Sequence, residues 1–353
     1  MAQKLLNNKY ERSRNELAPK QRGLVSEQPK KTAKNLGGFR YEQSSDHRCH
    51  YRRNPCSYPD RVPAHYTRPN RTAAAARAQK IADFAQILVH THVRDPKDGH
   101  PSADIDMFKT VCKKIKDNCN ALICVTTGGD PTTMTLEQRL RPVSELEPEL
   151  ASFNGGSFNF SMHPIADKFE TFQYEWERPH LLKSEDNIHY NTFKSMREYL
   201  DLFAEKDTKP EFEIYDMGQL SNLAFMIKGG KIKMPVDIQF ILGVLGGLPA
   251  TVENLVHMVD QAEKVLGKGN FVWSVVGAGK MQMQLGAVAL AMGGNVRVGL
   301  EDSVWLEKGV KAKSNAEQVT KIIRIAKELG REIATPDEAR GLLKVKGEDK
   351  VKF

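Results

Sequence analysis

The sequence predicts an α/β fold, a parallel barrel built from strand–helix units, on three observations. From about residue 85, short runs rich in β-branched and aromatic residues alternate with amphipathic stretches of helical length. Polar residues follow several of these runs at their C-terminal ends, the edge at which parallel barrels carry active sites. A chain of 353 residues with 40% hydrophobic residues can also bury the core of one large barrel.

Seven strand–helix units follow one another after residue 85. The predicted strands are 86–93, 121–126, 151–160, 210–216, 236–242, 271–276 and 296–300, and 236–242 is interpreted as wholly apolar. The predicted helices are 102–118, 191–206 and 316–329, with others beginning at 136 and 251 and one ending at 292. The segment 162–183 is too long for an ordinary barrel loop and is interpreted as a functional lid. Because a closed barrel needs eight strands, one strand is unaccounted for.

Two histidines at the end of the first predicted strand are the most informative candidates. His90 and His92 alternate along the strand, so they share a face and can bind one metal ion. Glu301, just after the last predicted strand, is the best candidate for a third ligand. Two His and one Glu form a zinc set that leaves a fourth position for water or substrate, which indicates catalysis. The alternative is that the histidines merely form a polar strand end.

Glycine pairs follow two other predicted strands. Gly128 and Gly129 come after 121–126, and Gly246 and Gly247 come after 236–242. Such loops allow backbone amides to approach phosphate, although plain turns are an equally good interpretation. We therefore treat the four glycines as candidate contacts for a phosphate-bearing cofactor.

Charge is distributed unevenly along the chain. Of the 52 Lys and Arg and the 44 Asp and Glu, 18 and 6 lie in residues 1–80, which leaves 34 and 38 for the rest. The net charge of +8 is thus a property of the N-terminal segment, which contains no recognisable nucleic-acid-binding module. We expect no nucleic-acid partner.

Other features predict a protein of the cytoplasm. No run of eighteen apolar residues and no secretory apolar segment occurs in the sequence, so no membrane association is expected. The five cysteines form no C-x-x-C pair, and an odd number favours reduced thiols.

Five ordered motifs carry a resemblance to a known family. Across roughly residues 85–340, the chain resembles the β-keto acid cleavage enzymes, typified by 3-keto-5-aminohexanoate cleavage enzyme. The motifs are 90–95 (HTHVRD), 126–129 (TTGG), 210–213 (PEFE), 243–249 (GVLGGLP) and 297–302 (RVGLED). The resemblance implies a TIM barrel that holds zinc, is homo-oligomeric and is an acyltransferase. In the implied reaction, a β-keto acid and acetyl-CoA give acetoacetate and a new acyl-CoA.

The resemblance also implies roles for particular residues. His90, His92 and Glu301 would bind zinc, Asp302 would be the base and Arg297 would orient it. Thr126 stands where the family usually has Ser and keeps a hydroxyl for hydrogen bonding.

The residue types suit this chemistry independently. Removing the proton between a ketone and a carboxylate makes an enolate, which a Lewis acid stabilises, and a carboxylate such as Asp302 can accept the proton. The alternative role for Asp302 is support of a metal ligand. Glu213 is a further catalytic candidate because Glu211, Glu213 and Tyr215 share one face of a strand and direct acids into the barrel mouth.

The first 84 residues do not fit the resemblance, which places the first strand just before residue 85. Residues 46–55 (DHRCHYRRNP) have no apolar pattern of a buried strand. Shifted by one base, the codons possible for residues 46–54 permit Ile-Ile-Asp-Ala-Ile-Thr-Gly-Ala-Ile, which resembles the family's first strand and turn. We therefore interpret 1–84 as a basic segment that is disordered or partly out of frame, and 85–353 as the catalytic barrel.

Two other functions remain open at this stage. A zinc-dependent hydrolase or aldolase could use the same ligands, since a fold does not fix a reaction. A barrel that has lost its first strand could also be catalytically inactive, because open edges would flank the metal site. The sequence leaves the identity of the keto acid open.

Overall fold

The computed structural model describes residues 87–130 and 133–353, which form a curled seven-stranded parallel sheet wrapped by helices. The strands follow one another in the order β1-β2-β3-β6-β7-β8-β9. Their bounds are β1 Leu88–Thr91, β2 Leu122–Val125, β3 Leu150–Asn154, β6 Lys209–Ile214, β7 Val236–Leu242, β8 Phe271–Gly277 and β9 Asn295–Val296. The predicted α/β barrel class is thus confirmed, with seven of its strands in the described part of the chain.

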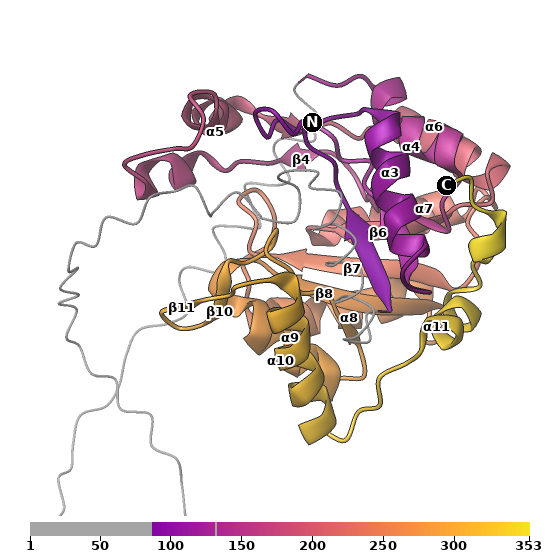
Figure 1. The fold of residues 1–353 in the computed structure, drawn as a ribbon. Helices are drawn as coiled ribbons and strands as arrows, with labels where there is room; N and C mark the ends of the chain where they lie inside the picture. Colours follow the sequence, from indigo (N-terminus) through magenta and orange to yellow (C-terminus); the bar gives the residue numbers. More distant parts are fainter. Residues whose placement is uncertain (1–86, 131–132) are drawn as a thin grey trace, which may run out of the picture. The chain divides into compact units, whose positions relative to one another are not determined.

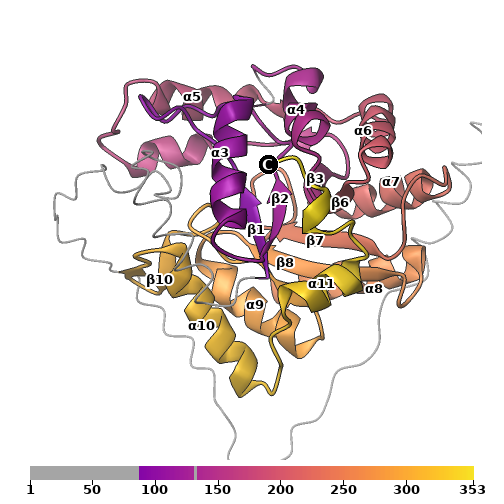
Figure 2. The ribbon, with the colours of Figure 1, turned by 45° about the vertical axis from the view of Figure 1, so that its right-hand side comes forward.

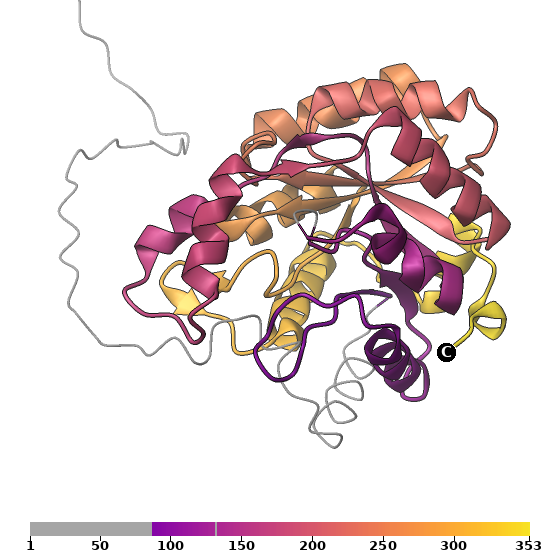
Figure 3. The same cartoon turned by 90° about the horizontal axis from the view of Figure 1, so that it is seen from above.

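A helix follows each strand on the outside of the sheet, as Figures 1 and 2 show. These helices are α3 Ile105–Lys116, α4 Leu136–Leu146, α6 Phe193–Glu205, α7 Met217–Ile227, α8 Val252–Leu266, α9 Gln282–Ala291 and α10 Asn315–Glu328. Seen from above in Figure 3, the strands cross inside an arc of helices. This alternation is the arrangement that the strand–helix pattern predicts.

Side-chain caps fix where these helices begin. Asp104, Thr192, Thr251 and Ser314 each accept a hydrogen bond from a backbone N–H in the first turn of the following helix. Such bonds satisfy backbone groups that have no partner within the helix. The strand-to-helix loops, which lie at the edge where the strands end, are held in place by these caps.

The core lies between the strands and the outer helices. Phe153, Tyr199, Phe203 and Phe212 are at most 2% exposed, and the Phe153 ring packs 4.9 Å from that of Phe212 and 5.2 Å from that of Tyr199, between centroids. All residues of β2, β3 and β7 are buried, as expected for strands of a parallel sheet covered on both faces.

Several predicted boundaries are wrong. The predicted strand 151–160 ends at Asn154, and a short antiparallel pair follows, β4 Phe158–Asn159 with β5 Ile188–His189. The predicted strand 296–300 is only the two residues of β9. Beyond that point Val298–Leu300 leave the sheet, and the backbone N–H of Leu300 is bonded instead to the Asn315 side chain.

The segment 162–183 carries structure of its own. It contains η2 His163–Lys168 and α5 Glu177–Lys183, and η3 Ser184–Asp186 follows it. Trp176 stacks on His100 with centroids 3.9 Å apart, and its Nε1 donates to Asp98 O. The segment therefore packs against the loop that follows β1. Its role as a lid stays a prediction.

The C-terminal region adds elements that the sequence pattern did not predict. After β9 come the hairpin strands β10 Trp305–Glu307 and β11 Val310–Lys311, and the chain ends with α11 Pro336–Leu343 and η5 Glu348–Lys350. A further short helix, η4 Gly279–Met281, precedes α9.

The predicted first strand and the boundary at residue 84 lie outside the described residues. Each helix in the described part of the chain is too short or too polar to span a membrane.

Candidate active site

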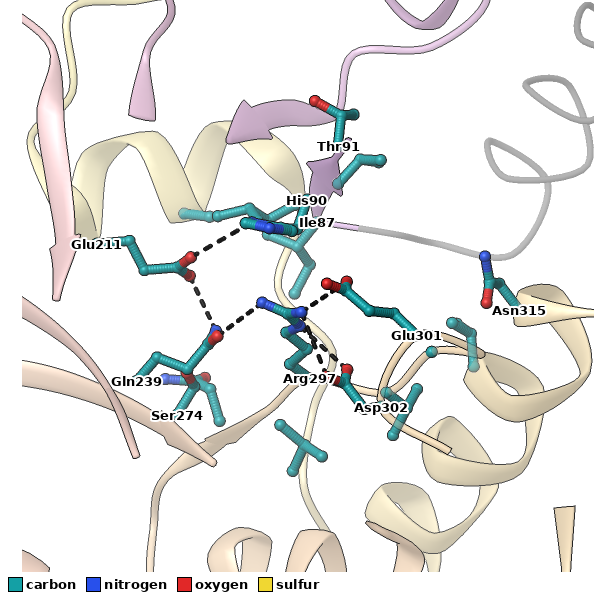
Figure 4. Close-up of a pocket in the computed structure, with 18 of the residues that line it drawn as sticks. Ile87, His90, Thr91, Glu211, Gln239, Ser274, Arg297, Glu301, Asp302 and Asn315 are labelled. Carbon is teal, nitrogen blue, oxygen red and sulfur yellow. Dashed lines mark hydrogen bonds and ion pairs between the residues drawn. The ribbon is translucent and has the colours of Figure 1, made fainter. Parts of the chain in front are cut away.

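The candidate site lies where the two end strands of the sheet face each other. His90 and His92 come from the end of β1, and Arg297, Glu301 and Asp302 come from the turn after β9. These side chains line one cavity of about 990 Å³. Figure 4 shows the Arg297 guanidinium between Gln239 and the carboxylates of Glu301 and Asp302.

The three predicted metal ligands converge. His90 Nε2 lies 3.0 Å from His92 Nε2, and His92 Nε2 lies 2.9 Å from Glu301 Oε1. Two atoms bound to a tetrahedral zinc at about 2.0–2.1 Å are roughly 3.3 Å apart, so shifts of a few tenths of an ångström suffice for coordination. One atom of each residue falls within 4.8 Å of the others. The donor set and its spacing fit zinc.

The protonation state of His90 also suits metal binding. Burial and the charge of Arg297 lower the pKa of His90 well below its usual value, so the imidazole is neutral at pH 7. Among residues 87–130 and 133–353, its buried Nδ1 finds no hydrogen-bond partner, and it lies 3.9 Å from Glu211 Oε2. A neutral imidazole is the form that coordinates zinc through Nε2.

A second group of possible ligands, His90, Cys124 and Glu211, shares one histidine with the first. Burial raises the pKa of the Cys124 thiol well above its usual value. Because zinc binds the thiolate and not the thiol, the set with His92 and Glu301 is the better one.

Arg297 connects the metal ligands to the rest of the site. Its Nη2 donates to Glu301 Oε2 at 2.8 Å, and its Nε donates to Asp302 Oδ2 at 3.1 Å. Its Nη1 donates to Gln239 Oε1 at 2.9 Å and lies 3.6 Å from Glu213 Oε1. The structure places Arg297 beside Asp302, and one guanidinium binds both carboxylates of the turn.

The two neighbouring carboxylates differ in their affinity for a proton. Burial raises the pKa of Asp302 to about 6, against the opposing charge of Arg297. For Glu301, desolvation is outweighed by the charges of His92 and Arg297, and its pKa lies well below the usual value. Glu301 therefore stays an anion suited to a cation, whereas Asp302 has the pKa of a base that works near neutral pH.

Further acids lie deeper in the barrel. Burial raises the pKa of Glu213 to about 8 and also raises the pKa values of Glu211 and Asp237. Glu213 lies near Arg297, as the shared strand face predicts, and Tyr215 Oη donates to Glu213 Oε2 at 3.5 Å. Burial thus favours the protonated form of these three acids.

Gln239 is the site residue that the sequence interpretation missed. It is 2% exposed and links Arg297 to Glu211, whose Oε1 accepts from Gln239 Nε2 at 3.0 Å. The interpretation of 236–242 as wholly apolar is wrong, because Asp237 and Gln239 point into the barrel and line the cavity. The signal was available: two polar residues two positions apart in an otherwise apolar strand share a face.

Thr126 and the candidate glycines lie outside the lining of this cavity. Thr126 Oγ1 accepts a hydrogen bond from Gly128 N at 3.0 Å, and Gly247 N donates to Val244 O at 3.0 Å. Gly246 has φ +107°, and a Cβ there would overlap the backbone carbonyl of Asn159. Close backbone packing thus explains Gly246 without a ligand.

Fold and site together define a class: a parallel α/β barrel enzyme with a His-His-Glu cluster that could bind a metal and an adjacent arginine–carboxylate pair at the C-terminal edge of its strands. The chain belongs to the beta-keto acid cleavage enzyme family, because the model of that family matches residues 67–345. It is accordingly an enzyme of carbon–carbon cleavage and acyl transfer, related to proteins that use acetyl-CoA.

Two relatives support the assignment. The 3,5-dioxohexanoate:acetyl-CoA acetone transferase of Paraburkholderia graminis is 43% identical over 281 residues, which cover 80% of this chain and 89% of the relative. The 3-keto-5-aminohexanoate cleavage enzyme of Fusobacterium nucleatum is 35% identical over 272 residues, covering 77% and 88%.

Solved structures of ObcA share the fold. A ternary complex of ObcA with a C4-CoA adduct and oxalate matches with a TM-score of 0.59 and 18% identity, over 77% of this chain and 66% of that one. The apo structure matches with a TM-score of 0.58 over 78% and 64%. This chain therefore spans about two thirds of the length of ObcA.

Proposed function

We propose that this chain is a zinc-dependent β-keto acid cleavage enzyme that converts a β-keto acid and acetyl-CoA into acetoacetate and a new acyl-CoA. The observation that carries the proposal is the convergence of His90, His92 and Glu301 beside the Arg297–Asp302 pair. Family membership and the names of the relatives support the same reaction.

His90, His92 and Glu301 would hold the zinc, which when bound supplies a Lewis acid for the ketone oxygen of the substrate. Asp302 takes the proton from the carbon between ketone and carboxylate, for which a pKa of about 6 is suited. The resulting enolate attacks the thioester carbonyl of acetyl-CoA and expels the CoA thiolate. The thiolate then attacks the original ketone carbon of the adduct, and the bond from that carbon to the carbon that carries the acetyl group breaks. This gives the new acyl-CoA and the enolate of acetoacetate, which takes back the proton held by Asp302.

Arg297 keeps Asp302 in position during proton transfer. Two of its nitrogens donate to the two oxygens of Asp302, and the same guanidinium also donates a hydrogen bond to the Glu301 carboxylate. Once Asp302 is protonated, Arg297 still has Glu301 as an ionic partner. The guanidinium therefore remains fixed through the reaction and is also placed to bind the acid group of a substrate.

The CoA contacts remain proposals. Gly128, Gly129, Gly246 and Gly247 could approach its phosphates, but the amides of Gly128 and Gly247 are already bonded within their own loops. Gly129, with φ +57°, is the better of the four candidates. Thr126 is proposed as a hydrogen-bonding residue, because its hydroxyl accepts from Gly128 N and can still donate its proton.

Three conclusions from the sequence stay predictions: a cytoplasmic location, assembly as a homo-oligomer, and small molecules as the only partners. The 43% identical relative suggests 3,5-dioxohexanoate as the first keto acid to assay.

The test is acetoacetate formation by the purified full chain, supplied with zinc, acetyl-CoA and a panel of β-keto acids headed by 3,5-dioxohexanoate. We expect turnover with at least one member, and a fall in kcat of about 10²–10⁴-fold for Asp302→Asn. Asp260→Asn, an exposed residue of α8, is the matched control and should keep full activity. Acetoacetate formation that is unchanged in Asp302→Asn would contradict the proposed base. Hydrolysis or aldol cleavage without acetyl-CoA would favour the alternative zinc enzyme.

A further inference from the structure

Thr126, just after β2, lies beside the strand that carries the candidate metal ligands. Strand β2 pairs with β1 in the register His90↔Cys124, and the backbone N–H of Thr126 donates to Thr91 O at 3.1 Å. Because side chains alternate along a strand, Thr126 shares a face of the sheet with Cys124 and His90. That face is the barrel interior, where Cys124 Sγ donates to Glu211 Oε2 at 3.4 Å. The Thr126 hydroxyl therefore belongs to the edge of the sheet at which the substrate would bind.

The peptide between Thr127 and Gly128 is held by two donors. The Thr127 carbonyl accepts from Arg139 Nε at 2.9 Å and from Tyr199 Oη at 3.3 Å. In a trans peptide the carbonyl and the following N–H point in opposite directions, so the Gly128 N–H points away from these donors. It donates to Thr126 Oγ1 at 3.0 Å. A hydroxyl that accepts this bond keeps its own proton for another acceptor.

Arg139 of α4 also contacts the residues around the short strand β5. Its Nη1 donates to Tyr190 O at 3.1 Å, and its Nη2 donates to His189 Nε2 at 3.3 Å. Burial and the charge of Arg139 lower the pKa of His189 to about 3, so this imidazole is neutral and can accept the bond. One side chain thus connects the loop after β2 to the β4–β5 pair, and three anchors fix its guanidinium.

The charge of Arg139 has no negatively charged partner in the part of the chain that the structure describes. Arg139 is 5% exposed, and it contacts two carbonyls, an imidazole and the Tyr199 ring, whose centroid lies 5.7 Å away. Arg340 shows the contrast, because Glu149 neutralises it through two bonds of 2.8 and 3.0 Å. A buried cation without a counter-ion costs free energy and attracts an anion to its surroundings. The loop beside Arg139 is therefore suited to an anionic ligand.

Gly129 brings the same loop into direct contact with the arginine. It has φ +57°, and a Cβ there would lie 3.1 Å from Arg139 Cγ and 2.8 Å from Met134 Sδ. The absence of a side chain lets the backbone rest on the Arg139 stem. The position of the loop thus depends on where Arg139 is held.

We propose that Arg139 is a positioning residue of the active site, which fixes the Thr127–Gly128 peptide and thereby directs the Thr126 hydroxyl proton to an anionic oxygen of the β-keto acid. Tyr199 assists as the second donor to the same carbonyl. The inference rests on the proposed function, because it takes the β-keto acid as the ligand. It deepens that function by assigning the residues that hold Thr126 ready to donate.

The test is a double-mutant cycle between Arg139 and Thr126, read as the Kd of acetoacetate for the full chain supplied with zinc, by titration calorimetry. Arg139→Lys keeps the charge but cannot make the three bonds, and Thr126→Val removes the hydroxyl. We expect each to raise Kd about 3–10-fold, as for the loss of one hydrogen bond. The double variant should bind within about twofold of Thr126→Val alone, because Arg139 acts through the hydroxyl. In Thr126→Ser, which keeps a hydroxyl, Arg139→Lys should again weaken binding.

A second variant guards against a misfolded Arg139→Lys protein. Tyr199→Phe removes only the other donor to the Thr127 carbonyl, so Kd should rise about 2–3-fold, and not at all in the Thr126→Val background. Arg141→Lys is the matched control in the same helix, since that side chain is 43% exposed and pairs with Glu145. It should bind acetoacetate as the parent does. In kinetics the KM for the keto acid should rise in both variants, whereas the KM for acetyl-CoA should stay unchanged.

Three outcomes overturn the proposal. If the losses from Arg139→Lys and Thr126→Val multiply in the double variant, Arg139 does not act through the hydroxyl. Unchanged Kd values in folded Arg139→Lys and Tyr199→Phe proteins mean that the peptide needs neither donor. A parent that does not bind acetoacetate has no anion site at this loop. Binding is measured without turnover, so coupling in a protein that forms no acetoacetate would contradict only the proposed reaction.

Discussion

The two ends of the sheet and its middle are built very differently. In the middle, β7 and β8 pair over seven residues and β3 and β6 over five, and the side chains of β3 and β7 are all buried. At the ends, β8 and β9 pair over two residues and β1 is half-buried along most of its length. Yet His90, His92 and the Arg297–Asp302 turn all come from the ends. The candidate site therefore lies at the ends of the sheet, whereas the strands that contribute most to stability lie in its middle.

The largest expected effect is at a metal ligand of the end strands. His92→Ala removes the imidazole shared by both short ligand contacts, so bound zinc should fall from about one per chain to near zero. We expect acetoacetate formation to drop by about 10⁴-fold because the Lewis acid is lost. Measured without metal, the melting temperatures of the variant and the parent should differ little. Metal analysis and steady-state kinetics measure the two quantities.

The control for this variant is His257→Ala, on an exposed position of α8. It should keep both zinc and activity. A His92→Ala protein that retains stoichiometric zinc would mean that other residues hold the metal and would break the link between chemistry and the end strands.

The next largest effect belongs to the middle of the sheet. Phe212 of β6 is fully buried and packs on Phe153, so Phe212→Ala should lower the free energy of unfolding by about 3–5 kcal/mol. Zinc content per folded chain should stay the same. Urea denaturation measures the loss, and Phe225→Ala, at a ring 59% exposed, should cost less than about 1 kcal/mol. Equal losses for the two variants would refute the assignment of stability to the middle strands.

The sequence predicts the strands of the sheet better than it predicts how the site residues come together. The alternation of β-branched runs and amphipathic helices predicts seven of the strands, because burial on both faces and helix periodicity are local patterns. The spacing of His90 and His92 likewise places both on one face. Glu301 was chosen as the third ligand from its place after the last predicted strand, and the family resemblance agreed with that choice, but no local pattern tells which distant residues a sheet brings together.

Other features depended on tertiary contacts. Strand β9 ends at Val296, and beyond it the backbone N–H of Leu300 donates to the Asn315 side chain. The sequence does not reveal this contact. Gln239 is visible in the sequence as a polar residue of an apolar strand, but its hydrogen-bond partners Glu211 and Arg297 come from other parts of the chain and are not.

A third prediction concerns Glu213, which joins the middle of the sheet to the site. Its pKa is about 8 in the folded protein against 4.5 for an ordinary glutamate. The folded state therefore holds a proton that the unfolded state has already lost between pH 4.5 and 8, and stability falls as pH rises through that window. Glu213→Gln cannot titrate, so its stability relative to the parent should increase between pH 5 and 8 by on the order of 3 kcal/mol.

Urea denaturation at a series of pH values measures this difference. Glu328→Gln, at an exposed position near the end of α10, should show the same pH profile as the parent. A constant difference between Glu213→Gln and the parent across the window would mean that Glu213 is ionised in the folded protein, with Arg297 as its effective counter-ion.

The smallest effect is expected at a pair of matched valines. Val275 of β8 is fully buried, and its register partner is Val296 of β9. Val296 is only half-buried, because β9 is the last strand of the sheet. Val275→Ala should cost about 2 kcal/mol, whereas Val296→Ala should cost less than about 1 kcal/mol, because little of the removed surface was shielded from water. Equal costs for the two valines would indicate that β9 is already covered on its open side.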